Sequence, residues 1–284
     1  MYKKVLAAVN EYTNSEVATR YAIAFAKSCR ASLSLVFVAR PGIGLDIFRQ
    51  AESALQRLFV EAEKNGVDVE GITEKGDPFD KINRIVKKND IDIVFAATRR
   101  EDVKKRFFVK TFARELALKL PCSVAMVRVV RMGKTHPGHI LVPFRGRMTG
   151  LREMAYFTAK LAEGFGASAT LFHLPRSMKK FIHGEIHLKP VQREERIPAE
   201  VEHFLEYLKR YGIPHEKRTS HGSVAREITI EASLRKNDLI IMGASERSLL
   251  GSLIGENPVE DVLRETTCNL IVFRPGHDSA KRFA

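Results

Sequence analysis

The feature that most constrains the fold of this chain is an internal repeat of its apolar blocks. The matching segments are residues 5–9 with 140–144 (offset 135), 31–35 with 167–171 (offset 136), and 92–94 with 238–240 (offset 146). From Gly76 and Gly222 onward the offset stays at 146 without a gap. Few residues are identical, but an unrelated segment would drift out of register over so many blocks. The chain is therefore a duplication, for which we expect domains at residues 1–131 and 137–277 and a C-terminal tail at 278–284.

Each half alternates between the hydrophobic periods of strands and of helices. In the first half, the segments with strand character are residues 5–9, 33–38, 69–73, 91–96 and 123–127. The segments with helical spacing are residues 15–28, 45–64, 79–88 and 110–119. Parallel strands need a crossover between them, and a helix commonly provides it. We therefore predict an α/β fold with two repeated open, twisted parallel sheets of five strands each and helices on both faces.

Length and composition exclude several other classes of protein. The chain has 284 residues, of which 44% are hydrophobic, and this suffices for two packed cores. No apolar run approaches the roughly 20 residues that cross a bilayer, because charges interrupt each one. The N-terminal apolar run stops at Asn10 and Glu11, so it predicts a strand in a cytoplasmic protein rather than a signal peptide. Cys29, Cys122 and Cys268 show neither metal-ligand spacing nor a disulfide framework.

Positive charge is the unusual global property, with a formal net charge of +13. The basic residues are spread along the chain and alternate with acids on the predicted helices. The second half is longer than the first by about ten residues after its second strand, and the extra segment lies within the basic stretch 175–198. Two interpretations of this insertion stay open: a solvated loop, or a docking surface for an anionic partner.

Three segments of the second half form a recognisable pattern: residues 238–245 (DLIIMGAS), 259–264 (VEDVLR) and 268–273 (CNLIVF). A strand that ends in glycine, then a helix and a cysteine-led strand, resembles the closing signature of universal stress protein domains. The resemblance extends over nearly the whole chain, twice. It implies the adenine-nucleotide α-hydrolase-like fold, with adenine nucleotide bound at the carboxyl ends of the strands in some members. It also implies that the two domains pair through their last strands, here residues 124–127 and 270–273.

The nucleotide motif that the resemblance implies is degenerate in the second half. That motif has glycine, two residues, glycine, nine residues, glycine, and then serine or threonine, so that backbone amides and a hydroxyl reach the phosphates. Counted from Gly243, the later positions fall on Glu246, Glu256 and Asn257. Arg145 stands where the family has an acidic side chain that contacts adenine. Carboxylates repel phosphates, so we predict that this site does not bind ATP in the manner of the family.

The first half has lost the glycines but surrounds the same loop with positive charge. The four motif positions fall on Ala97, Arg100, Lys110 and Thr111, and Asn10 follows the first strand. Guanidinium groups match phosphate oxygens, so basic side chains can replace backbone amides as phosphate ligands. The candidate nucleotide- or anion-binding residues are Asn10, Arg99, Arg100, Lys110 and Thr111. The alternative is a degenerate loop whose charges face water.

These patterns leave several functions open. No nucleophile elbow, Walker-type loop or zinc-binding histidine pair is present, so we predict no catalytic residue and no metal site. The leading interpretation is a non-enzymatic regulatory protein of the stress response, which binds an unidentified protein partner or, weakly, a nucleotide such as ATP or AMP. The second is a switch that senses ATP or AMP in its first domain, and a homodimer beyond the internal domain pairing also stays open. An adaptor for nucleic acid or membrane surfaces ranks last, because the sequence has no aromatic RNA-binding motif.

Overall fold

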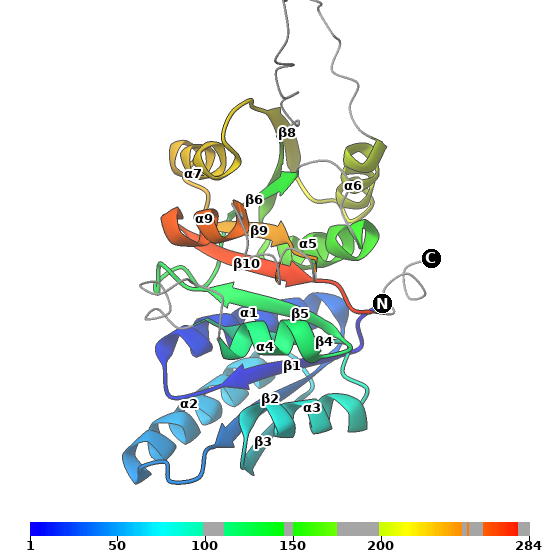
Figure 1. Ribbon diagram of the computed structural model, residues 1–284. Coiled ribbons are helices and arrows are strands. Elements are labelled where there is room, and N and C mark those ends of the chain that lie inside the picture. Colours follow the sequence, from blue (N-terminus) through cyan, green and yellow to red (C-terminus); the bar gives the residue numbers. More distant parts are fainter. Residues whose placement is uncertain (99–110, 145–149, 175–198, 246–248, 250–257, 278–284) are drawn as a thin grey trace, which may run out of the picture.

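A computed structural model describes residues 1–98, 111–144, 150–174, 199–245, 249 and 258–277 of the chain (Figure 1). The elements of the first half are β1 (Lys4–Val9), α1 (Thr13–Cys29), β2 (Ser32–Ala39), α2 (Leu45–Lys64), β3 (Val69–Lys75), α3 (Pro78–Lys88), β4 (Ile93–Ala97), α4 (Phe112–Lys119) and β5 (Ser123–Arg128). Those of the second half are β6 (His139–Phe144), α5 (Leu151–Phe165), β7 (Ser168–His173), α6 (Ala199–Arg210), β8 (His215–Thr219), α7 (Val224–Leu234), β9 (Leu239–Gly243), α9 (Pro258–Glu265) and β10 (Asn269–Arg274). None of the helices in the described part of the chain is both long enough and apolar enough to cross a membrane.

The ten strands in the described part of the chain form one sheet, in the order β3-β2-β1-β4-β5-β10-β9-β6-β7-β8. Five strands come from each half, and within each half every neighbouring pair is parallel. The halves meet where β5 and β10 pair antiparallel, with Met126 opposite Val272. The predicted α/β fold is confirmed, and so is the pairing through the last strands. Because each last strand covers the other, neither is left as an open edge.

Two layers of helices cover the sheet. Helices α1, α2, α5 and α6 pack on one face, and helices α3, α4, α7 and α9 pack on the other. Both apolar layers run without a break across the junction of the halves. On the first face, the rings of Phe157 and Phe273 stack with 4.4 Å between their centroids. The two halves therefore share their cores, which gives the pairing a hydrophobic driving force.

The chain segments that leave the last strands are held by the first residue of the opposite last strand. Asn269, which is fully buried, accepts hydrogen bonds from the backbone N–H groups of Val130 and Arg131 through Oδ1, both at 2.8 Å. Ser123, at the equivalent position of the first half, accepts one from the N–H of Gly276 at 3.0 Å. This reciprocal arrangement is a trace of the duplication, and it fixes the linker that joins the halves.

Candidate functional site

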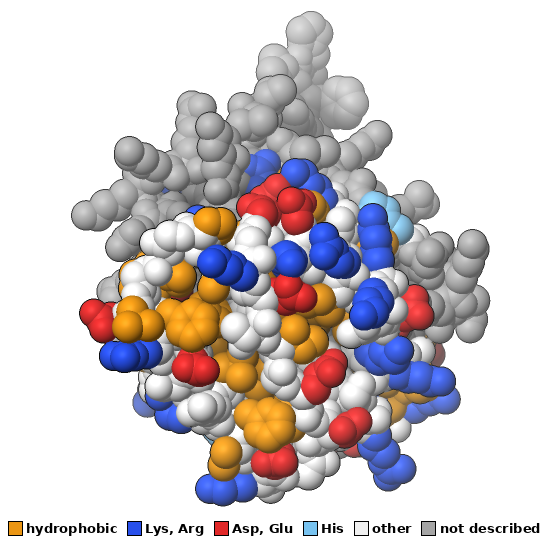
Figure 2. All heavy atoms as spheres, turned by 90° about the horizontal axis from the view of Figure 1, so that it is seen from below, with side chains coloured by type: hydrophobic (Ala, Val, Ile, Leu, Met, Phe, Trp, Pro, Cys, Tyr) orange, Lys and Arg blue, Asp and Glu red, His pale blue; other side chains and the backbone are white. Residues whose placement is uncertain are grey.

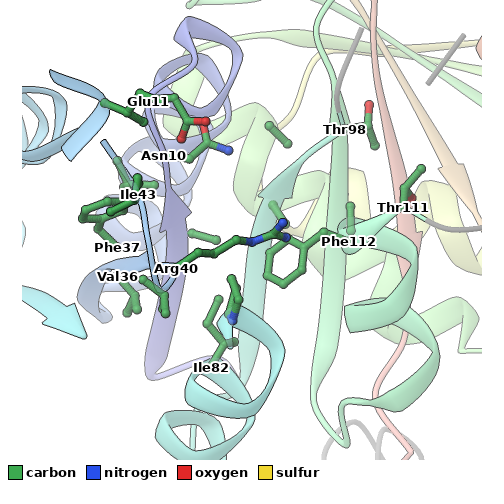
Figure 3. Close-up of a pocket in the computed structure, with 18 of the residues that line it drawn as sticks. Asn10, Glu11, Val36, Phe37, Arg40, Ile43, Ile82, Thr98, Thr111 and Phe112 are labelled. Carbon is green, nitrogen blue, oxygen red and sulfur yellow. The ribbon is translucent and has the colours of Figure 1, made fainter. Parts of the chain in front are cut away.

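A pocket of about 500 Å³ opens at the carboxyl ends of β1, β2 and β4 in the first half (Figure 3). Between β1 and β4 the strand order reverses, because the chain leaves β1 for a helix on one face and leaves β4 for a helix on the other. A crevice forms at such a switch point, and open α/β sheets bind their ligands there. The volume is in the range of small-molecule sites.

Small apolar side chains form the floor of the pocket. Ala8, Val36, Val38 and Ala96 come from three adjacent strands, and Ile82 of α3 adds to the wall. None of these four strand side chains is larger than valine, although Phe37 of β2 also lines the pocket. A flat apolar group, such as an aromatic ring, fits a surface of this kind.

Polar side chains stand around this floor on opposite sides. Figure 3 shows Asn10 and Glu11 on one side, Thr98 and Thr111 on the other, and Arg40 projecting across the pocket in this view. The pocket therefore combines an apolar floor with a few polar groups, the pattern typical of ligand sites.

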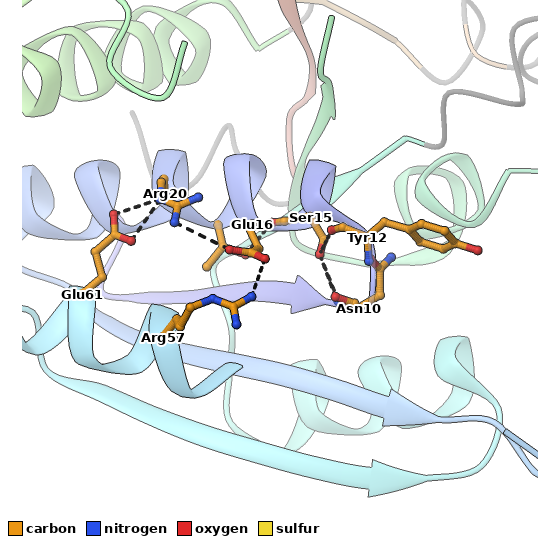
Figure 4. A network of polar contacts seen from close by, with 8 residues as sticks. Asn10, Tyr12, Ser15, Glu16, Arg20, Arg57 and Glu61 are labelled. Carbon is orange, nitrogen blue, oxygen red and sulfur yellow. Dashed lines mark hydrogen bonds and ion pairs between the residues drawn. The ribbon is translucent and has the colours of Figure 1, made fainter. Parts of the chain in front are cut away.

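The turn after β1 orients Asn10. Its Oδ1 accepts a hydrogen bond from the N–H of Tyr12 at 2.9 Å, while Ser15 Oγ accepts from the N–H of Asn10 at 3.1 Å (Figure 4). This Asx turn uses the side-chain oxygen and leaves the Nδ2 amide as the group that Asn10 can offer to a ligand.

An ion-pair network next to this turn ties α1 to α2 (Figure 4). Glu16 pairs with Arg57 at 2.8 Å, and Arg20 pairs with Glu61 at 3.0 Å. Each exposed pair contributes little alone, but together they anchor α2, which follows the pocket-lining segment 40–43. The network thus connects the helix after β1 with the helix after the segment 40–43.

Thr98, which lines the pocket, and nearby Asn14 each carry a buried polar atom with no hydrogen-bond partner among the described residues. Asn14 donates from Nδ2 to the backbone oxygen of Thr98 at 2.6 Å, yet Asn14 Oδ1 and Thr98 Oγ1 are unpaired. Thr98 lines the pocket and is 9% exposed. An unmet buried hydroxyl costs on the order of 1–3 kcal/mol, so Thr98 Oγ1 is a group that a ligand or water would satisfy.

The N-terminus of α4 forms another wall. Thr111 caps this helix, since its Oγ1 accepts from the N–H of Arg114 at 3.3 Å, and Phe112 and Ala113 continue along the pocket. The free N–H groups of a first helical turn carry partial positive charge. Together with the Arg40 guanidinium, this wall favours an anionic group on the ligand.

The pocket brings together two of the predicted residues, Asn10 and Thr111. The other three predicted for the first half lie outside the described residues; they are Arg99, Arg100 and Lys110. Sequence reasoning missed Arg40 and Thr98. Both directly follow a strand, β2 and β4, and the rule that ligands bind beyond the carboxyl ends of parallel strands could have found them.

The second half carries larger side chains at the positions that form the floor of the pocket. At the offsets of the repeat, Val36 corresponds to Phe172, Val38 to Leu174, Ala8 to Pro143, and Ala96 to Met242. Phe172 and Leu174 are each 2% exposed, and Met242 is 7% exposed. Larger side chains are therefore buried in the second half at the positions that form the pocket floor in the first half.

Of the residues predicted for the second site, Gly243 is the last residue of β9. The other four lie outside the described residues; they are Arg145, Glu246, Glu256 and Asn257. His173 ends β7 beside Phe144, with 6.1 Å between the ring centroids, and is 8% exposed.

The duplicated sheet and its switch-point pocket define a class: an α/β protein with a crevice at the place where open α/β sheets bind their ligands. The sequence model of the universal stress protein family matches residues 1–128 and 137–274. The chain therefore belongs to the universal stress protein family and contains the family's domain twice. No curated protein matches the chain in sequence.

Solved structures confirm the tandem fold. A universal stress protein from Archaeoglobus fulgidus DSM 4304 is 16% identical, with a TM-score of 0.66 and 97% of each chain covered. A protein of unknown function from Pseudomonas aeruginosa PAO1 is also 16% identical, with a TM-score of 0.64, covering 99% of this chain and 95% of the other. A family protein from Arabidopsis thaliana with AMP bound covers 44% of this chain and 91% of its own, at 19% identity and a TM-score of 0.33. That last likeness is too low to bear on what this chain binds.

Proposed function

We propose that this chain is a non-enzymatic regulatory protein of the stress-response kind whose first domain, residues 1–131, binds one small anionic ligand. AMP and ATP are the candidates that the pocket suits best. The second domain, residues 137–277, binds none at the equivalent place and serves as the first domain's permanent partner. The observation that carries this proposal is the asymmetry of the crevices, with small side chains in the first half and large ones in the second.

The pocket supports this ligand class through three kinds of contact. The alanine and valine floor accepts a base by apolar contact. Asn10 Nδ2 and Thr98 Oγ1 offer hydrogen bonds to its edge or to the sugar. The N-terminus of α4 and the Arg40 guanidinium attract phosphate. Asn10 is a neutral side chain at the position where the family's nucleotide motif has a carboxylate.

Binding is tested by calorimetric titration of the nucleotide-free protein with AMP, ATP and pyrophosphate at moderate salt. Saturable binding of AMP or ATP is expected, while pyrophosphate, which lacks the base, binds more weakly. Absence of saturable heat with all three ligands contradicts the proposal and moves the search to protein partners.

The Arg40→Glu variant tests which end of the pocket meets the phosphate. We expect its affinity for AMP to fall about tenfold or more, because a charge-assisted contact is replaced by repulsion. Arg210→Glu, an equal change of charge on an exposed residue of α6, is the matched control and should bind as wild type does. Equal losses in both variants would indicate a general effect of net charge, and unchanged affinity in Arg40→Glu would remove Arg40 from the site.

Binding of nucleic acid through overall positive charge gains no support from the face around β3. Figure 2 shows this face with acidic and basic side chains interspersed rather than gathered into one positive patch. Polyanion binding needs a continuous positive surface, which this face does not present.

A further inference from the structure

Helix α4 contacts the pocket on one side and the second half of the chain on the other. Its cap and first turn, Thr111, Phe112 and Ala113, line the pocket. The next residue, Arg114, is 5% exposed and donates a hydrogen bond from a terminal guanidinium nitrogen to the backbone oxygen of Leu249 in the second half. The pocket wall and a contact between the halves therefore adjoin each other within one turn of helix.

The last turn of α4 is also held by the second half. Arg274 of β10, which is 2% exposed, donates from Nε to the backbone oxygen of Ala117 at 2.7 Å. It also donates from a terminal nitrogen to the backbone oxygen of Leu120 at 2.6 Å. A cation at the carboxyl end of a helix satisfies carbonyls that have no partner within the helix. The second half thus holds α4 at both ends.

The charges at this contact differ between the two copies of the domain. Position 114 of the first half corresponds to position 260 of the second at the offset of 146, so Arg114 is the counterpart of Glu260. Burial lowers the pKa of Arg114, and the Glu260 carboxylate acts in the opposite direction. The second half therefore supplies the counter-charge for this buried cation, whereas two identical copies would bring like charges together across the junction.

We propose that Arg114 is a positioning residue through which the second half sets the geometry of the α4 wall, so that ligand affinity in the first half depends on the second half. This inference rests on the proposed function for its affinity readout. Arg114 does not touch the ligand; it acts through Thr111, Phe112 and Ala113. The second domain then acts as a support that holds one wall of the first domain's pocket in place.

The first test measures AMP affinity in the full-length chain with Arg114→Met, Arg114→Lys and Phe204→Leu. Phe204 is a fully buried residue of α6 on the opposite face of the sheet, so its truncation lowers stability without touching α4. We expect Arg114→Met to weaken AMP binding about tenfold, within the usual range of coupling between sites. Arg114→Lys should recover part of the loss, and Phe204→Leu should leave the affinity within about twofold of wild type. Equal affinity in Arg114→Met and Phe204→Leu would overturn the inference.

A second readout needs no ligand. Hydrogen exchange of the amides of Arg114 and Glu115, which are bonded to Thr111, should be faster in Arg114→Met than in Phe204→Leu, with exchange in α3 alike in both. Unchanged protection of these amides would overturn the inference even if AMP binds. If wild type binds no AMP, the proposed function fails, and the exchange measurement alone decides whether the second half holds the α4 wall.

Discussion

Asp238 shows how a single residue of this fold is tuned by its partners. Its Oδ2 accepts a hydrogen bond from the N–H of Gly138 at 2.9 Å, and its Oδ1 pairs with Lys134 at 2.9 Å. Burial raises the pKa of Asp238, but the Lys134 and Gly138 contacts and His139 outweigh it, so the pKa lies below its usual value. Asp92, its counterpart in the first half, accepts from the N–H groups of Lys3 and Lys4. Both residues act structurally, as their positions at the starts of equivalent strands indicate.

The pH dependence of stability follows from this lowered pKa. A carboxylate whose folded pKa lies below its unfolded value of about 3.9 stabilises the fold above that pH, and the contribution is lost as pH falls through the folded pKa. Asp238→Asn should therefore lower the free energy of unfolding by about 1–3 kcal/mol at pH 7. In urea titrations the difference from wild type should shrink below about pH 4. Asp68→Asn, an exposed loop change, is the control; a difference that persists undiminished at low pH would contradict the assignment.

At the scale of elements, the crossing of α1 and α5 depends on a glycine within a helix. A Cβ at Gly164 would lie 2.8 Å from the carbonyl carbon of Ala24 and closer still to its oxygen, so the two backbones are in contact. Ser28 Oγ donates to the backbone oxygen of Lys160 at 2.6 Å and joins the same two helices. The absence of a side chain at Gly164 therefore sets how closely the halves approach.

This contact reverses the usual effect of replacing glycine by alanine in a helix. Alanine at an exposed helical site stabilises by roughly 0.5–1 kcal/mol, whereas Gly164→Ala should destabilise by about 1–3 kcal/mol because of the clash. Gly133→Ala, where an added Cβ meets nothing within 4 Å, should be neutral. Urea unfolding of both variants tests this, and a Gly164→Ala protein as stable as wild type would show that the helices do not cross so closely.

Much of the architecture at this scale could be predicted from the sequence. Apolar periodicity placed the helix at 45–64 as found, and the constant offset predicted the duplication. The close approach at Gly164 could not be predicted, because it depends on how two helices distant in sequence cross. Arg40 and Thr98 were not predicted, because the nucleotide motif lies within a single loop of the sequence. The pocket, by contrast, is lined by residues at the ends of three different strands.

For the whole molecule, duplication has produced two domains whose equivalent positions carry different side chains. The shared sheet and cores make each half the other's partner, and Arg114 and Glu260 show that equivalent positions have diverged to opposite charge. The crevices have diverged too, through Val36 and Ala96 in one half against Phe172 and Met242 in the other. This asymmetry predicts one ligand per chain, bound in the first half.

Native mass spectrometry at saturating AMP tests this claim most directly, on wild type and on Val36→Phe/Ala96→Met. The double variant copies Phe172 and Met242 into the first half, at positions whose counterparts the same fold already accommodates. We predict one AMP per wild-type chain and none on the double variant, with circular dichroism unchanged. Two AMP molecules per wild-type chain, or one retained by a folded double variant, would contradict the assignment of the site to the pocket of the first half.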